Sequence, residues 1–295
     1  MEKFVLRIFR ALMYRSKFAD RISALETRTQ LLEIWNFDLN LMKINYEKVL
    51  KLLQLHKVNE IPLLRIGSKN DGGYVLANSF ESIEFVVSLG VGSNVESEIY
   101  FADLNKKVYL FDGTIKKLPR KHENFRWESV NVYGKNPGPN SSVEWKSFNE
   151  VLIEVFEDIN LPIRKKTLDS KADAVLMMDI EGSEYDVLLN LKSEYLSRFQ
   201  QVSIEFHSVH RELRENQDRL ERCLSKLNQS HILIAAHGNN FGGYVSLNGQ
   251  DYPDVLELSW LKKGVGTFAK VPNSLLGNLS NPNNPRNREL QLEWR

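Results

Sequence analysis

The spacing of hydrophobic residues changes near Pro62 and divides the chain into two regions. Before Pro62 an apolar residue recurs at every seventh position from Phe4 to Leu53, and neither proline nor glycine interrupts the pattern. After Pro62, short apolar runs alternate with stretches of helical periodicity. The spacing therefore predicts a long N-terminal helical segment over residues 1–60 and an α/β domain over residues 61–271.

The N-terminal pattern has two interpretations. A seven-residue apolar repeat is typical of a coiled coil, which would make the protein a homo-oligomer, and the alternative is a helix packed on its own domain. Arg7, Arg21 and Arg28 stand where a coiled-coil seam is apolar, which weakens the first interpretation. The first 17 residues also place basic side chains opposite apolar ones. This arrangement fits either peripheral membrane contact or a solvated helix.

Beyond Pro62 the alternation predicts a mostly parallel sheet with crossover helices. We expect strands near 84–89, 107–111, 127–132, 174–179, 200–206, 231–236 and 255–260, and the clearest helices at 183–197 and 209–228. The last strand follows its predecessor through a Gly- and Asn-rich loop, which predicts an antiparallel hairpin at the sheet edge. Residues 272–295 are rich in Asn and Pro, so we expect a loose tail.

Composition narrows the class of protein. The formal net charge is only +1, so nucleic acid is not an expected partner. A single cysteine, Cys223, excludes an internal disulfide and a cysteine-rich zinc module. No apolar run approaches the roughly 20 residues that span a bilayer. The first residues also lack the apolar core of a secretory signal, so we expect a cytoplasmic protein.

A glycine loop follows the first strand of the predicted sheet. Gly90, Gly92 and Asn94 lie in the segment SLGVGSN, and glycine there lets the backbone turn tightly and a ligand approach it closely. The third glycine of a dinucleotide fingerprint is replaced by Val95, which favours a nucleoside ligand without a pyrophosphate. Asp112 ends the next strand, where an acid accepts hydrogen bonds from ribose hydroxyls.

Acids and histidines end three later strands. Asp179 and Glu181 follow the fourth strand, Glu205 and His207 end the fifth, and His237 ends the sixth. If these strands are neighbours, their tips converge and supply a general base. A helix cap at Glu181 and hydrogen-bonded structural histidines are the alternatives. A divalent metal fits imidazole with carboxylate, although no metal-binding spacing such as His-Glu-x-x-His is present.

The segment RIGSKNDGGYV precedes the sheet. Asn-Asp-Gly-Gly is first of all a turn signature. Its functional interpretation is a flap over the glycine loop, in which Arg65 or Asp71 meets the charged end of a ligand.

Together these motifs resemble the FkbM-type methyltransferases, class I S-adenosylmethionine-dependent enzymes, and within them the branch that includes methyltransferase-like proteins. The resemblance covers about residues 61–262. It rests on RIGSKNDGGYVL, SLGVGSN, LFDGT, MMDIEGSEYDVL, SIEFH and HGNN followed by PDVLELSWL. It implies a Rossmann-like fold whose seven-stranded sheet is mostly parallel with an antiparallel last strand.

The resemblance also implies roles for site residues. Gly90, Gly92 and Asp112 would hold the methionine and ribose parts of S-adenosylmethionine, and the loop after Asp179 would lie beside the methyl group. Ser88 stands where many methyltransferases place an acid that binds the amino group of the cofactor. That contact is left to Asp71 or Asp179.

The leading hypothesis is therefore an S-adenosylmethionine-dependent O-methyltransferase that acts on a hydroxyl of a sugar, glycan or other small molecule. One alternative is an NAD(P)-dependent oxidoreductase on a similar fold, which Val95 argues against. The other is a non-catalytic oligomerising scaffold with a degenerate methyltransferase fold.

Overall fold

The computed structural model describes residues 43–135, 144–159, 173–215, 217–247, 250–271 and 279–290, together with residues 28 and 41. The chain divides into two compact units, Met1–Tyr46 and Glu47–Arg295. Residues 43–52 are helical. Most of the predicted N-terminal helix, with its coiled-coil repeat and its basic face, lies outside the described residues. Among the described helices, none is both long and apolar enough to cross a membrane.

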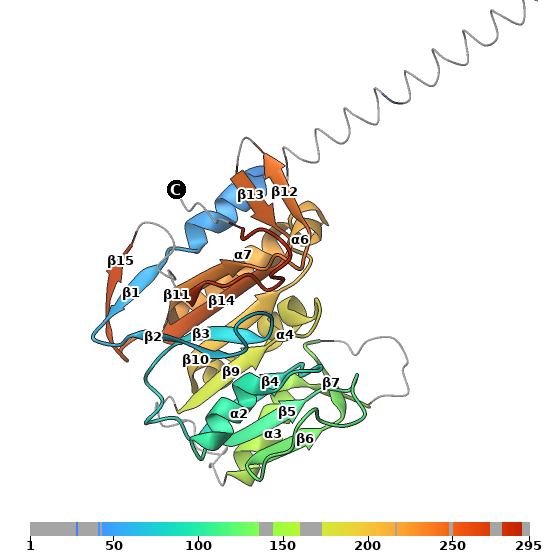
Figure 1. Cartoon of the computed structure of the whole chain (residues 1–295), viewed down its shortest axis with the longest axis vertical. Coiled ribbons are helices and arrows are strands. Elements are labelled where there is room, and N and C mark those ends of the chain that lie inside the picture. The colour runs from blue at the N-terminus through green and yellow to red at the C-terminus, as the bar shows by residue number, and fades with distance from the viewer. Residues whose placement is uncertain are drawn as a thin grey trace, which may run out of the picture. The chain divides into compact units, whose positions relative to one another are not determined.

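A seven-stranded sheet forms the centre of the second unit (Figure 1). Its strands are β11 (His231–Gly238), β14 (Leu256–Lys262), β10 (Phe199–Phe206), β9 (Ala174–Met178), β4 (Phe85–Leu89), β5 (Lys107–Phe111) and β6 (Phe125–Glu128), in that spatial order. The neighbours from β10 to β6 are parallel, whereas β14 is antiparallel to both β10 and β11. The mostly parallel seven-stranded sheet is therefore confirmed.

The predicted antiparallel hairpin at the sheet edge is confirmed: β11 and β14 pair antiparallel, with β11 outermost and β14 between β11 and β10. One detail of the predicted sheet is different. The strand expected at 127–132 is two strands, β6 in the main sheet and β7 (Val130–Tyr133), which pairs with β8 (Glu144–Ser147). Apolar and polar residues alternate within each of the two strands, and this alternation does not reveal the change of partner.

The helices are α2 (Glu96–Asp103), α3 (Phe148–Asp158), α4 (Glu184–Asn190), α5 (Ser193–Leu196), α6 (Val209–Glu215) and α7 (Gln217–Ser230). The helix predicted at 183–197 is divided into α4 and α5, and the break falls at Leu191, whose backbone is extended. The helix predicted at 209–228 corresponds to α6 and α7, which lie on either side of residue 216, outside the described residues. A capping box fixes the start of α3, since Ser147 and Glu150 exchange hydrogen bonds with each other's backbone.

The central strands are buried on both faces, as parallel strands between two helical layers are. On one face, Val86 belongs to a hydrophobic cluster with Phe101 of α2. On the other face, the ring of Phe85 packs edge-on against Phe156 of α3. This packing leaves the loops at the carboxyl ends of β4, β5 and β9 as the free edge where a site can form.

Small two-stranded sheets surround this core. β1 (His56–Asn59) pairs with β15 (Thr267–Lys270), β2 (Leu63–Gly67) with β3 (Gly73–Ala77), and β12 (Tyr244–Leu247) with β13 (Gln250–Pro253). The β2–β3 hairpin confirms the turn expected at Asn-Asp-Gly-Gly. Hydrogen bonds from Asn94 to the backbone of Asp71 and from Ser97 to the backbone of Gly72 join this hairpin to the glycine loop and α2.

Residues 279–290, which we call the C-terminal segment, differ from the loose tail expected from their composition. The side chain of Asn240 donates hydrogen bonds to the carbonyls of Asn284 and Arg288 and accepts one from the backbone N–H of Asn284. Arg288 forms a bidentate pair with Asp251. The segment is therefore held by individual polar contacts, which an apolar pattern cannot reveal.

Candidate active site

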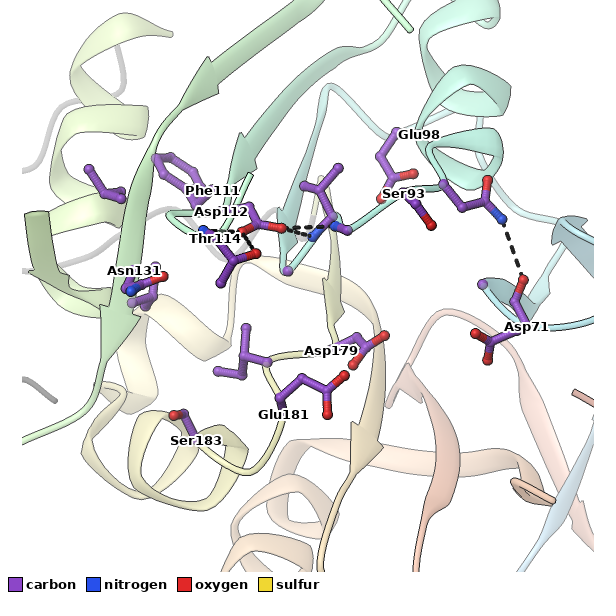
Figure 2. Close-up of a pocket in the computed structure, with 18 of the residues that line it drawn as sticks. Asp71, Ser93, Glu98, Phe111, Asp112, Thr114, Asn131, Asp179, Glu181 and Ser183 are labelled. Atoms are coloured by element: carbon purple, nitrogen blue, oxygen red, sulfur yellow. Dashed lines mark hydrogen bonds between the residues drawn. The ribbon is translucent and has the colours of Figure 1, made fainter. Parts of the chain in front are cut away.

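A cavity of about 440 Å³ lies at the carboxyl ends of β4, β5 and β9 (Figure 2). Its volume is within the range of small-molecule sites. Figure 2 shows Asp112 and Thr114 on one side of the cavity and Asp179 and Glu181 on the other. The glycine loop, the loop after β9 and the β2–β3 turn thus meet at one place, as the sequence predicts.

Gly90 and Gly92 occupy positions of the loop with different steric surroundings. Gly90 has a φ of 77°, and a Cβ there would lie 1.6 Å from the carbonyl oxygen of Asp179. Gly90 therefore allows β4 and β9 to end side by side. A Cβ on Gly92, by contrast, would meet no atom within 4 Å. Because Gly92 lines the cavity, its bare backbone leaves room for a ligand.

Asp112 holds the glycine loop in shape. Its Oδ2 accepts hydrogen bonds from the backbone N–H groups of Val91 (2.9 Å) and Gly92 (2.8 Å), and its Oδ1 accepts from Thr114. Burial by itself raises the pKa of Asp112, but these hydrogen bonds outweigh burial and lower the pKa. The carboxylate stays ionised, and because four hydrogen bonds occupy its roughly four acceptor positions, a ligand hydroxyl can bind it by replacing the Thr114 hydroxyl.

The loop Asp-Ile-Glu-Gly-Ser-Glu is held by its last acid. One oxygen of Glu184 accepts hydrogen bonds from the backbone N–H groups of Ile180 (3.1 Å) and Gly182 (3.0 Å). Glu181 adopts a left-handed backbone with a φ of 54°, which is uncommon for a residue with a side chain. The fully buried Glu184, which sequence reasoning did not single out, thus directs Asp179 and Glu181 toward the cavity.

His207 is surrounded by carboxylates. Its Nδ1 lies 2.9 Å from an oxygen of Glu184, and its Nε2 lies 3.6 Å from oxygens of Asp179, Glu181 and Glu205. Burial alone would lower the pKa of His207, but the hydrogen bond and charge of Glu184 and the charges of Asp179 and Glu181 raise it to about 9. His207 is therefore protonated at neutral pH.

Asp179 faces His207 with an oxygen, Oδ1, that is buried and accepts no hydrogen bond from the described residues. Burial raises the pKa of Asp179 to about 7. The value includes the positive charge on His207, which acts to lower the pKa, and the charges of Glu181, Glu184 and Asp71, which act with burial to raise it. A carboxyl group with this pKa exchanges a proton readily at neutral pH.

Three other candidates occupy the rim of the site or lie behind it. Asp71 and Asn94 line the cavity. Arg65 is absent from the described lining residues and donates hydrogen bonds to the carbonyls of Ser68, Asn70 and Leu279, so it supports the β2–β3 turn.

Glu205 and His237 lie behind the cavity wall. The 6% exposed Glu205 accepts a hydrogen bond from Asn239. His237 has its two ring nitrogens 3.1 Å and 2.7 Å from oxygens of Glu257 and Glu289, and it does not line the cavity. Because both ring nitrogens are engaged by carboxylates, His237 has no free nitrogen to take a proton from a ligand in the cavity.

Sequence reasoning also missed Glu98, a buried residue of α2 that lines the cavity. Ser88, at the end of β4, donates a hydrogen bond of 2.6 Å to Glu98. Burial is the main cause that raises the pKa of Glu98 to about 7. In the sequence nothing local distinguishes Glu98 from the exposed Glu96 two positions earlier in the same helix.

Within the described part of the chain, two groups bring together three side chains of the kinds that bind metal ions. One consists of Asp179, Glu184 and His207, and the other of Asp71, Glu205 and Glu257. In each group, hydrogen-bond donors already engage a carboxylate, as with Glu184 in the first group and Glu205 in the second. A metal ion would compete with these donors for the carboxylate oxygens. Binding of a divalent metal stays a prediction.

The charged side chains in the described lining of the cavity are all acidic. Its described lining includes five acids and no lysine, arginine or histidine. The acids are Asp71, Glu98, Asp112, Asp179 and Glu181. Such a lining attracts a cationic ligand and repels a phosphate.

Comparison with known proteins adds a family match. The model of the FkbM methyltransferase domain matches residues 76–231, more than half of the chain. Among solved structures, a mutant of the 16S rRNA (adenine(1408)-N(1))-methyltransferase from Catenulisporales acidiphilia is 14% identical, with a TM-score of 0.28. That match covers 61% of this chain and 86% of the other. No curated protein matches the chain.

Proposed function

The chain belongs to the FkbM methyltransferase family, whose members use S-adenosylmethionine, and from this premise we propose that it methylates a hydroxyl oxygen of a sugar or glycan. The observation that carries the proposal is the acidic cavity beside the glycine loop. S-adenosylmethionine carries a sulfonium and an ammonium group, whereas NAD(P) carries phosphates. The lining therefore favours the methyl donor over a dinucleotide.

The cavity residues fit such a cofactor. Gly92 leaves open space where a side chain would stand, and Asp112 is an ionised acceptor for ribose hydroxyls. The apolar side chains of Phe111, Val130 and Val132 line the same cavity and can pack against an adenine ring.

Asp179 is the proposed general base. When bound, S-adenosylmethionine supplies an electrophilic methyl group on a positively charged sulfur. As the acceptor oxygen bonds to the methyl carbon and the carbon–sulfur bond breaks, the hydroxyl proton passes to Asp179, whose pKa of about 7 suits this task. Glu184 holds His207 in place, and the His207 imidazolium stabilises the ionised carboxylate of Asp179.

The chemical class of the methyl acceptor is inferred from the acids that line the cavity. Asp179 and Glu181 are carboxylates at the cavity, and carboxylates accept hydrogen bonds from hydroxyl groups. The same negative charge repels anionic acceptors. A neutral polyhydroxylated molecule therefore suits the site best, and a small hydroxylated metabolite shares this chemistry.

The direct test is methyl transfer from labelled S-adenosylmethionine to a panel of glycans, lipids and small hydroxylated metabolites. We expect label in a hydroxylated acceptor and none in anionic analogues. Calorimetric titration with S-adenosylhomocysteine and NADH tests the cofactor separately. Binding of NADH with none of S-adenosylhomocysteine would overturn the proposal in favour of an oxidoreductase.

A further inference from the structure

Glu98 is a buried acid of the cavity with no cationic partner among the described residues. Its exposed fraction is 5%, and the hydrogen bond from Ser88 is its contact with another side chain. A buried carboxylate without a cation is costly, and a glutamine or an apolar residue would join α2 to β4 with less penalty. Packing alone therefore does not account for an acid at this position.

The other four acids of the cavity are differently engaged. Asp112 accepts backbone N–H groups, and Asp71 accepts a hydrogen bond from Asn283. Asp179 and Glu181 both face the Nε2 of His207. Glu98 is thus the acid of the described lining that is deeply buried and whose described side-chain partner is a single neutral hydroxyl, beside its own backbone N–H.

We propose that Glu98 binds the α-ammonium group of S-adenosylmethionine, with Ser88 holding the carboxylate in place. Ser88 stands at the strand end where many methyltransferases carry the acid for this group. The 2.6 Å hydrogen bond brings the carboxylate of Glu98 to that same place from α2, ten residues later in the chain. The acid comes from the helix instead of the strand, and neither Asp71 nor Asp179 is needed for this contact.

The inference rests on the proposed function and is tested by binding, without turnover. Calorimetric titration compares S-adenosylhomocysteine with its deamino analogue, in which hydrogen replaces the α-amino group, on the wild type and on Glu98→Gln. A hydrogen bond to a charged group is worth about tenfold or more in affinity. We expect Glu98→Gln to weaken binding of S-adenosylhomocysteine about tenfold or more and binding of the deamino analogue less than about twofold.

Glu96→Gln is the matched control, because Glu96 is an exposed acid on the same helix and does not line the cavity. It should bind both ligands as the wild type does. If Glu98→Gln does not fold, as judged by its thermal transition, Ser88→Ala keeps the acid but removes its anchor, and it should selectively weaken S-adenosylhomocysteine.

The outcomes separate the two proposals. Equal loss of both ligands in a folded Glu98→Gln protein, or no loss of either, overturns the role of Glu98 and leaves the methyltransferase proposal intact. Failure of the wild type to bind S-adenosylhomocysteine at all would instead overturn the proposed function.

Discussion

His207 and Asp179 form a charged pair that the sequence predicts only as two nearby candidates. Glu184 engages the Nδ1 of His207, which leaves the Nε2 directed at the acids of the cavity mouth. Because His207 carries the proton at neutral pH, we assign the proposed role of hydroxyl-proton acceptor to the carboxylate of Asp179 and not to the imidazole.

Replacement of the base should separate chemistry from cofactor binding. We expect Asp179→Asn to lower kcat about 10²- to 10⁴-fold, the usual contribution of a general base. The affinity for S-adenosylhomocysteine should change much less, and calorimetry with single-turnover kinetics measures both quantities. Activity that persists in both Asp179→Asn and His207→Ala would place the base elsewhere.

The pH dependence should be bell-shaped. As pH rises through about 7, Asp179 loses its proton and kcat/KM increases; as pH rises through about 9, His207 loses its charge and kcat/KM falls. In His207→Gln the upper limb should disappear. The lower limb should move to higher pH, because the positive charge that lowers the pKa of Asp179 is gone while Glu181, Glu184 and Asp71 remain. A profile unchanged by His207→Gln would contradict the pairing.

The C-terminal segment connects elements that are far apart in the sequence. Asn70, in the β2–β3 turn, donates to the carbonyl of Pro282, while Asn283 donates to Asp71 of the same turn and to Glu257 of β14. The segment therefore fastens the turn that carries Asp71 to the sheet. It supports one wall of the cavity without lining it.

Asn240 should be the most sensitive residue of this connection. Asn240→Ala leaves backbone groups of residues 284–288 without partners, so we expect a loss of about 1–3 kcal/mol in the free energy of unfolding. Proteolysis near residues 279–290 should also become faster. Denaturant titration and mass spectrometry of digests measure these effects, with the exposed Gln229→Ala on α7 as a control. Equal stability and equal cleavage of the two variants would contradict the prediction.

The sequence predicts best the strands that consist of residues buried on both faces of the sheet. β4 and β9 are buried at every position, and their predicted bounds differ by a single residue from the observed ones. The insertion of β14 beside β10 is not predictable in this way, because periodicity does not specify the second pairing partner of a strand. Asn240 and Glu98 act through single polar contacts, and a hydrogen-bond partner 10 or 44 residues away has no local signature.

At the scale of the whole molecule, self-association through residues 1–60 stays a proposal. Because the second unit begins at Glu47, deletion of residues 1–46 leaves that unit complete. We expect the full chain to be oligomeric and the shortened chain monomeric by light scattering. The same pair of proteins, mixed with anionic and neutral vesicles, tests membrane contact. An unchanged oligomeric state would remove the coiled-coil interpretation, and equal vesicle binding would remove the membrane one.

The insertion of β14 between β10 and β11 has a consequence for folding during synthesis. The two flanking strands are complete some 18 residues or more before β14 begins, yet they pair through it and not with each other. Until Leu256–Lys262 has left the ribosome, β10 presents an open edge that can pair with another chain. The half of the sheet that carries Gly90, Asp112 and Asp179 does not wait for this step. Aggregation should therefore be greatest for nascent chains that are arrested before residue 256.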